Sequence, residues 1–239
     1  MMFNVELAGI SIGLEDRYGL LYDHCKDYLT EKPSLFDVFV SDEEIKAEVD
    51  RREPGAPDSM AYGELVCVYR TICQKLPAYD VFLFHSAAIE HNGKAYLFSA
   101  PSGTGKSTHI RLWRENLTDR ISIINGDKPL IRVDKDGSLT VHSSPWAGKE
   151  GWQRNCAYPL GGICFLKRAT ENAITRLSAE EAGARVLSQI IYPKEPSALL
   201  KALTLADALV TTAPVFELGC NISNEAAKLS FETMTGEKF

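Results

Sequence analysis

The sequence predicts an α/β fold in which a mixed sheet with hairpins is combined with helices. Three observations support this prediction. A short apolar strand pattern, a glycine-rich turn and a helical pattern follow one another across residues 95–113. Turn residues at 92–93 (Asn-Gly) and at 134–137 each separate two strand patterns, as in hairpins. The 239 residues, of which 45% are hydrophobic, are also enough to bury a sizeable core.

Residues 1–78 are predicted to form a small N-terminal α/β subdomain of unknown role. Ser41 followed by Glu44 is a helix-start signature, and the helix after it is acidic. Apolar residues recur elsewhere with strand or helix periodicity. We expect strands at 3–14, with glycine interruptions, and at 36–40, and helices at 17–29, 41–52 and 59–76.

Residues 79–239 are predicted to form a second domain around the glycine-rich turn. Ser178 followed by Glu181 marks a further helix start, and residues 143–152 are predicted to form a loop. We expect strands at 81–90, 94–100, 121–124, 130–133, 139–142, 162–166 and 215–218. We expect one helix that begins at Lys106, and further helices at 178–191, 196–210 and 223–234.

Charge and cysteine content restrict the classes of partner. The formal net charge is −6 and no run of Lys or Arg occurs, which argues against nucleic acid or an acidic membrane as an obligatory partner. The six cysteines are scattered and do not have the spacing of zinc ligands. We therefore expect buried free thiols in a protein of a reducing compartment. The N-terminus lacks a basic leader, and no apolar run reaches bilayer length. We therefore expect a cytoplasmic protein. The sequence does not determine the oligomeric state, and it is compatible with a homo-oligomer.

The segment Ser102-Gly103-Thr104-Gly105-Lys106-Ser107-Thr108 connects the strand pattern to the helix. Gly103 and Gly105 allow positive φ, so that successive N–H groups can face an anion. The helix N-terminus, the Lys106 ammonium and the Ser107 hydroxyl suit phosphates and Mg²⁺. This segment therefore predicts binding of ATP with Mg²⁺. The usual pattern has glycine where Ala100 stands, so that this position must adopt a conformation that a Cβ tolerates.

Phosphoryl transfer also needs a carboxylate, and Asp127 is the leading candidate. It follows the strand after the Lys106 helix, at the sheet edge where ligands collect, and is expected to hold Mg²⁺ or to take a proton. Lys128, Arg132, Lys149 and Arg154 are cations that could reach the same edge. Lys149 is preferred because Trp146 and Gly148 suggest a shaped loop. The tryptophans of this loop, Trp146 and Trp152, fit core packing and acceptor contacts equally well.

These motifs resemble those of a known kinase group. His85-Ser86-Ala87 before a hairpin, the segment 102–107, and Asp127 after one further strand are similar to the HPr serine kinase group, whose P-loop fold is shared with phosphoenolpyruvate carboxykinase. The resemblance covers residues 80–170 and implies a P-loop kinase core. Its small bacterial members include kinases that phosphorylate serine in peptides. The resemblance implies that His85 lies near the phosphates or the acceptor, and that Lys106 and Ser107 bind triphosphate and metal.

One departure from that group bears on activity. The group has two adjacent aspartates after this strand, whereas Gly126 occupies the first position here. Asp127 is then either the general base or a metal ligand; in the second case Glu90 and Glu150 are the candidate bases. The first hypothesis is an ATP- and Mg²⁺-dependent kinase acting on a hydroxyl, with serine in a peptide, a protein or a small molecule as the acceptor. The alternative is a regulatory or assembly protein that binds nucleotide without phosphoryl transfer. A carboxykinase is disfavoured, because such enzymes are far longer and their substrate-binding arginines have no counterpart here.

Overall fold

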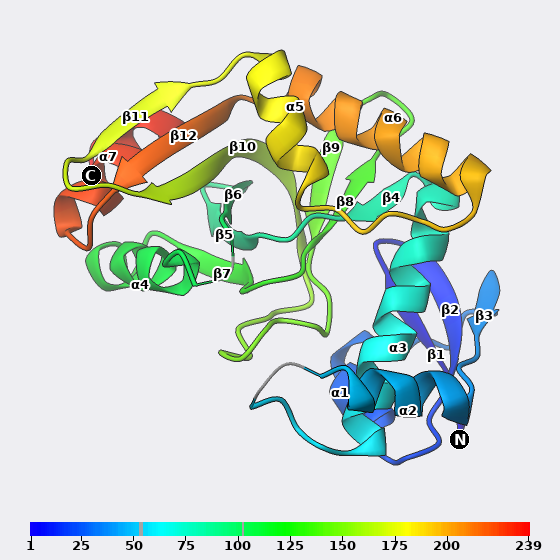
Figure 1. Ribbon diagram of the computed structural model, residues 1–239. Coiled ribbons are helices and arrows are strands. Elements are labelled where there is room, and N and C mark those ends of the chain that lie inside the picture. Colours follow the sequence, from blue (N-terminus) through cyan, green and yellow to red (C-terminus); the bar gives the residue numbers. More distant parts are fainter. Residues whose placement is uncertain (53–54, 102) are drawn as a thin grey trace.

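The structure is a computed structural model that describes residues 1–52, 55–101 and 103–239. It is a mixed α/β fold with two sheets, both curled and both mixed in strand direction (Figure 1). The N-terminal elements lie at one end of the molecule, and the C-terminus lies at the opposite end. The predicted α/β class is therefore confirmed.

The smaller sheet is formed by the N-terminal strands β1 (Met2–Leu7), β2 (Ile10–Glu15) and β3 (Phe36–Val38). β1 and β2 form an antiparallel hairpin, and β3 pairs parallel to β2. The turn uses Ala8 and Gly9, both at positive φ. The interruption expected near Gly9 is thus a hairpin turn.

Three helices accompany this sheet: α1 (Leu21–Cys25), α2 (Asp42–Asp50) and α3 (Met60–Lys75). Ser41 and Glu44 form the predicted capping box at the start of α2. The helix predicted at 17–29 is wrong in extent, since only α1 and a short 3₁₀ turn at 26–28 form. The Asp16 carboxylate accepts the N–H groups of Gly19 and Tyr22, which holds the preceding segment in a turn.

The larger sheet has nine strands in the described chain. Seven lie in the order β4-β8-β9-β10-β6-β5-β7, and β12 and β11 follow on the other side of β10. β10 pairs antiparallel to β9 through its first residues, and parallel to β6 and β12 through its later ones. The strands are β4 (Val81–Leu83), β5 (Ala87–His91), β6 (Lys94–Ser99), β7 (Ser122–Asn125), β8 (Leu130–Val133), β9 (Leu139–His142), β10 (Ala157–Arg168), β11 (Ala173–Arg176) and β12 (Val215–Cys220).

Helices cover both faces of this sheet. α4 (Lys106–Asn116) and α7 (Asn224–Thr235) lie on one face, where Trp113 and Phe231 pack against Phe98 and Leu218. α5 (Ala179–Leu187) and α6 (Pro196–Thr212) lie on the other face (Figure 1). Because successive side chains of a strand point to opposite faces, β6 sends Leu97 to the second core and Phe98 to the first. The strands that carry the site are therefore buried on both sides.

In the larger sheet, two predicted strands differ from the structure. The pattern at 81–90 is broken into β4 and β5, because residues 84–86 leave the sheet and bond to loops remote in sequence. The strand predicted at 162–166 is the second half of the longer β10. The helix predicted at 178–191 ends at Leu187, and β11 was not predicted. Both predicted hairpins form, with Asn92 and Gly93 at positive φ in the first.

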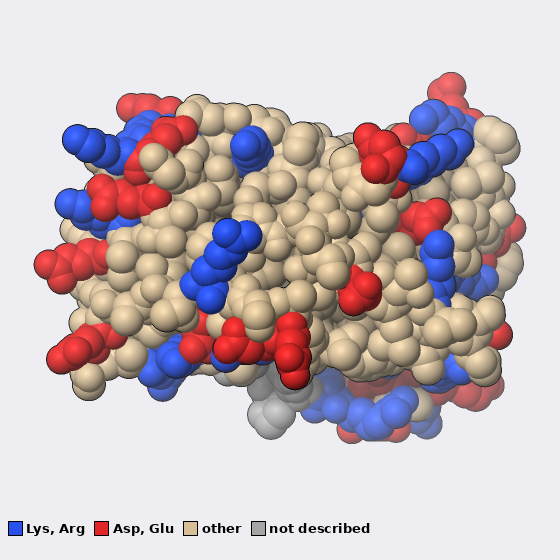
Figure 2. Space-filling model, turned by 90° about the horizontal axis from the view of Figure 1, so that it is seen from above, with Lys and Arg blue, Asp and Glu red and all other residues tan. Residues whose placement is uncertain are grey.

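The predicted division at residue 78 stays a prediction. The core around the smaller sheet also includes Val81 and Leu83 of β4, together with Leu130 and Trp146. All six cysteines are free thiols, and four of them are buried. Among the described residues no helix is long and apolar enough to cross a bilayer. On the face shown in Figure 2, charged side chains of both signs lie mainly near the edges, around a mostly uncharged centre.

Candidate functional site

The glycine-rich loop leads from β6 into the first turn of α4. Gly103 and Gly105 have φ of 75° and 118°, values that favour glycine, and Gly105 is the N-cap residue of α4. Ala100 is buried and is not among the positive-φ residues, so that its Cβ is tolerated as predicted. Lys106, Ser107 and Thr108 form the first helical turn. Ser102, which was predicted to bind nucleotide, lies outside the described residues.

Three of the predicted catalytic residues meet at the start of this helix. The Lys106 ammonium lies 2.7 Å from Oδ1 of Asp127, and Nε2 of His85 lies 3.1 Å from the same oxygen. Lys106 Nζ and His85 Nε2 are 3.0 Å apart. Lys128 Nζ donates to the other oxygen, Oδ2, at 2.7 Å. Both oxygens of the carboxylate therefore face cations or a titratable ring.

This arrangement sets the charge state of the two central groups. Burial acts to raise the pKa of Asp127, but the contact with His85 and the charges of Lys128 and Lys106 outweigh it. The pKa of Asp127 is therefore held well below its usual range. Burial lowers the pKa of Lys106, and the Asp127 carboxylate opposes that shift. The carboxylate is thus ionised at neutral pH, and it compensates a lysine with a side chain only 11% exposed.

His85 lies in the break between β4 and β5. Its backbone N–H donates to the carbonyl of Gln189 at 2.8 Å, and its Nδ1 lies 3.1 Å from the Gln189 amide oxygen. With the Nδ1 proton held by that oxygen, a neutral ring offers the lone pair of Nε2 to Lys106. A protonated ring instead donates from Nε2 to Asp127. Gln189, which follows α5, thus orients His85, and the sequence pattern had not singled it out.

Asn125, at the end of β7, was missed as well. Its side-chain oxygen accepts the N–H groups of Asp127 at 2.9 Å and of Lys128 at 2.7 Å. Its amide nitrogen donates to the Ser144 carbonyl at 2.9 Å. Asn125 is fully buried, so that these bonds fix the turn that presents Asp127. The Asn-Gly-Asp sequence was the available signal, because asparagine forms such turns readily.

Packing explains why one aspartate stands alone. A Cβ added at Gly126 would lie 3.0 Å from the Ala147 carbonyl oxygen and 3.4 Å from the Cβ of Trp152. The Gly126 N–H also donates to the Trp152 carbonyl at 2.7 Å. Gly148 in turn lies against Asp127, since a Cβ there would come within 2.9 Å of the Asp127 Cβ. The loop at 143–152 thus occupies the space that a second aspartate would need.

Other predicted residues lie away from the cluster. Lys149 is exposed in that loop, and among the described residues its side chain forms no hydrogen bond or ion pair. Glu150 pairs with Arg111 of α4, and Glu90 bonds to Gly93 and Ser122, so that neither candidate base faces Asp127. Arg132 and Arg154 bond elsewhere as well.

The two tryptophans of the loop have different surroundings. Trp146 is buried: its ring lies 5.0 Å from that of Tyr69, and its Nε1 donates to the Leu65 carbonyl of α3. Trp152 is half-buried beside Arg111 and Arg114. Core packing is therefore the observed role of Trp146.

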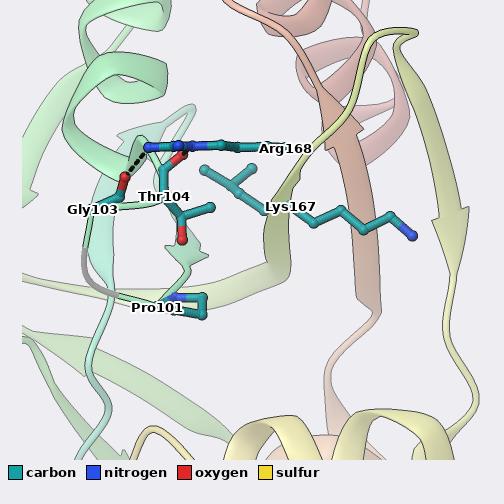
Figure 3. A pocket seen from close by; sticks show the side chains of 6 residues that line it. Pro101, Gly103, Thr104, Lys167 and Arg168 are labelled. Atoms are coloured by element: carbon teal, nitrogen blue, oxygen red, sulfur yellow. Dashed lines mark hydrogen bonds between the residues drawn. The ribbon is translucent and has the colours of Figure 1, made fainter.

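A pocket of about 470 Å³ adjoins the glycine-rich loop (Figure 3). Its walls are loop residues and the end of β10, namely Pro101, Gly103, Thr104, Leu166, Lys167 and Arg168. The pocket is open, and its size falls in the range of small-molecule sites. Arg168 had not been identified from the sequence.

The residues present suit Mg²⁺ only together with a nucleotide. Within the described part of the chain no cluster of three or more His, Cys, Asp or Glu side chains could hold a metal. Ser107 and Asp127 offer a hydroxyl and a carboxylate, and Mg²⁺ commonly takes its remaining ligands from substrate phosphates and water. Oδ2 of Asp127 is engaged by Lys128 and Oδ1 by Lys106, so that a metal ion would compete with these lysines.

The fold and the site define an α/β protein with a glycine-rich loop at a helix N-terminus and a Lys-Asp-His cluster beside it. The chain belongs to the family described as SynChlorMet cassette protein ScmC, whose model matches residues 53–225. No curated protein matches the sequence. Among solved structures, the chain is similar to the HPr(Ser) kinase/phosphatase from Coxiella burnetii, at 9% identity and a TM-score of 0.38, over 64% of this chain and 88% of that one. This similarity is weak and concerns the fold alone.

Proposed function

We propose that this protein is a kinase that transfers the γ-phosphate of ATP to a hydroxyl group, with Mg²⁺ as cofactor. The observation that carries the proposal is the contact of Lys106 with Asp127 and His85 at the N-terminus of α4, next to the glycine-rich loop. This is an anion site with a carboxylate at its edge, as phosphoryl transfer requires. The acceptor class is serine, in a peptide, a protein or a small molecule.

The proposed phosphoryl transfer depends on the ion pair between Lys106 and Asp127. Without nucleotide, its ammonium is neutralised by Asp127. When the β- and γ-phosphates lie against the loop, the ammonium turns to them, and Oδ1 of Asp127 becomes free to accept a hydrogen bond from the acceptor hydroxyl. His85 stays beside this oxygen and orients the hydroxyl or a phosphate oxygen.

The phosphoryl transfer is an in-line displacement at the γ-phosphorus. The hydroxyl oxygen forms a bond to the γ-phosphorus, the bond to the β–γ bridging oxygen breaks, and ADP leaves. The hydroxyl proton passes to Asp127 and then to solvent. A carboxylate is a weak base toward a hydroxyl group, which suits a loose transition state in which the proton is lost late. With Asp127 as the base, the Ser107 hydroxyl, water and phosphate oxygens would hold Mg²⁺, which would supply charge neutralisation at the phosphates.

The test is mass spectrometry of a reaction with ATP, Mg²⁺ and a pool of free serine, serine-containing peptides and hydroxylated metabolites. We expect a product heavier by one phosphoryl group. Lys106→Ala should lose both nucleotide binding and product. Asp127→Asn should still bind ATP, because removing the carboxylate leaves Lys106 available, and should form product at least about 100-fold more slowly. Asp136→Asn, in the exposed 134–137 turn, is the matched control. Absence of ADP formation with every acceptor would overturn the proposal.

A second candidate is a regulator that binds nucleotide without transferring phosphate. It is favoured by the packing of Gly126, which leaves a single aspartate. In that case ATP binding depends on Lys106, and no phosphorylated product appears. Asp127→Asn would then change neither nucleotide affinity nor any response that depends on the nucleotide.

A further inference from the structure

The last residue of β10, Arg168, contacts the glycine-rich loop. Its Nη2 donates to the carbonyl oxygen of Gly103, and its Nε donates to that of Thr104 at 3.4 Å. Figure 3 shows the guanidinium of Arg168 directed at the Gly103 carbonyl oxygen, with a dashed line marking the hydrogen bond. Lys167, its neighbour, pairs with Glu217 at 2.6 Å instead. Arg168 is thus the side chain at the end of β10 that bonds to the loop's peptide groups.

These two carbonyls belong to the peptide groups that supply the N–H groups of Thr104 and Gly105. In a trans peptide, the C=O and N–H bonds point in opposite directions. A cation that binds the carbonyls from outside therefore turns the two N–H groups toward the inner side of the loop. The Thr104 N–H is held within the loop, 3.1 Å from the Pro101 carbonyl oxygen. The Gly105 N–H is directed by the peptide whose carbonyl Arg168 binds.

The two glycines by themselves do not fix the orientation of the loop peptides. Gly103 and Gly105 are at positive φ, where glycine adopts many other conformations with similar energy. A contact from outside the loop therefore helps to select one orientation of the peptides. The planar guanidinium suits two neighbouring acceptors, because its donors are fixed as a fork, whereas a lysine ammonium binds as a point charge.

We propose that Arg168 is a positioning residue that holds the glycine-rich loop in the conformation that receives phosphate, by binding the Gly103 and Thr104 carbonyls. The role rests on the proposed function only in that the anion is the triphosphate of ATP; the ordering of the loop stands independently of it. Arg168 acts through the loop peptides.

The first test is hydrogen exchange in the protein without nucleotide, comparing wild type with Arg168→Gln and Arg168→Lys. We expect the amides of residues 103–106 to exchange about tenfold faster in both variants, because a hydrogen bond to a charged group is lost. Arg176→Gln, an exposed arginine on β11, is the matched control and should leave these amides unchanged. Unchanged exchange in both Arg168 variants would overturn the proposal.

The second test is the affinity for ATP and for inorganic pyrophosphate, a probe without a nucleoside. Both variants should bind each ligand about tenfold more weakly, with the midpoint of thermal unfolding close to that of wild type. If Arg168→Lys binds like wild type while Arg168→Gln is weak, the charge alone acts and positioning is refuted. If the wild-type protein binds neither ligand, but hydrogen exchange of the loop amides is still faster in the Arg168 variants, the proposed function fails and the role of Arg168 in ordering the loop stands.

Discussion

At the scale of single residues, the position and charge state of Asp127 depend on the residues around it. Asn125 fixes its backbone, two lysines and His85 neutralise or orient its carboxylate, and Gly126 allows the adjoining loop to pack closely. The sequence singled out Lys106 and Asp127 through local patterns and His85 through the family resemblance, and the structure brings the three side chains together. Sequence reasoning missed Gln189 and Arg168, because their partners are 104 and 65 residues away in the chain.

Gly126→Asp tests whether a second aspartate is excluded by packing. The new side chain would meet the Ala147 carbonyl oxygen at about the 3.0 Å that a Cβ reaches, and its charge would face that oxygen. We expect a loss of about 1–3 kcal/mol in the free energy of unfolding, measured by urea denaturation, and no gain in product formation. Gly126→Ala separates the steric part, about 1 kcal/mol, from the effect of charge. A stable Gly126→Asp variant with faster phosphoryl transfer would contradict this account.

At the scale of elements, local signals succeeded and remote pairings did not. The capping boxes at Ser41 and Ser178 and the Asn92-Gly93 hairpin formed as predicted, since each depends on neighbouring residues. The break at His85 was not visible in the apolar pattern at 81–90. It arises because the N–H groups of residues 84–86 bond to the carbonyls of Pro129, Gln189 and Asp127 in turn. Only the folded chain brings those carbonyls together.

The loop at 143–152 illustrates the same dependence on distant packing. Trp146 joins it to α3 through the ring of Tyr69 and the Leu65 carbonyl, and to α1 through the ring of His24. Trp146→Ala should lower the free energy of unfolding by about 3–5 kcal/mol, and Trp146→Phe by about 1 kcal/mol. Urea denaturation measures both. Trp152→Phe, at a half-buried position, serves for comparison and should cost less than either. If Trp146→Ala were as stable as wild type, the loop would not depend on α3.

At the scale of the whole molecule, the site lies where the large sheet divides. β10 joins the part that contains β9 to the part that contains β6, and the segment with His85 crosses between them. The glycine-rich loop therefore follows a strand, β6, that is paired on both sides and packed on both faces. No local pattern specifies this division, because it depends on which strands pair.

Burial across the molecule also determines how stability depends on pH. Burial lowers the pKa of His109 to about 4, that of His142 also to about 4, and that of His24. Their ordinary value is about 6.5, so that between these values the unfolded chain binds more protons than the folded one. Stability is therefore fully present above about pH 6.5 and falls as the pH drops toward 4. Asp127 contributes little in this window, because the stability that comes from its lowered pKa is lost mainly as the pH falls below the ordinary value of about 4.

His109 isolates this effect, since it is 3% exposed and its Nε2 lies 3.0 Å from the Ser230 hydroxyl. Between pH 7 and pH 5 the folded protein should lose about 2 kcal/mol through this histidine alone. Urea denaturation at the two pH values, in wild type and in His109→Gln, measures the difference. Glu64, the pKa of which is raised by burial, acts in the opposite direction but equally in both proteins. The variant should therefore show a pH dependence weaker by about 2 kcal/mol. An equal dependence in the two proteins would mean that His109 accepts a proton while the chain remains folded.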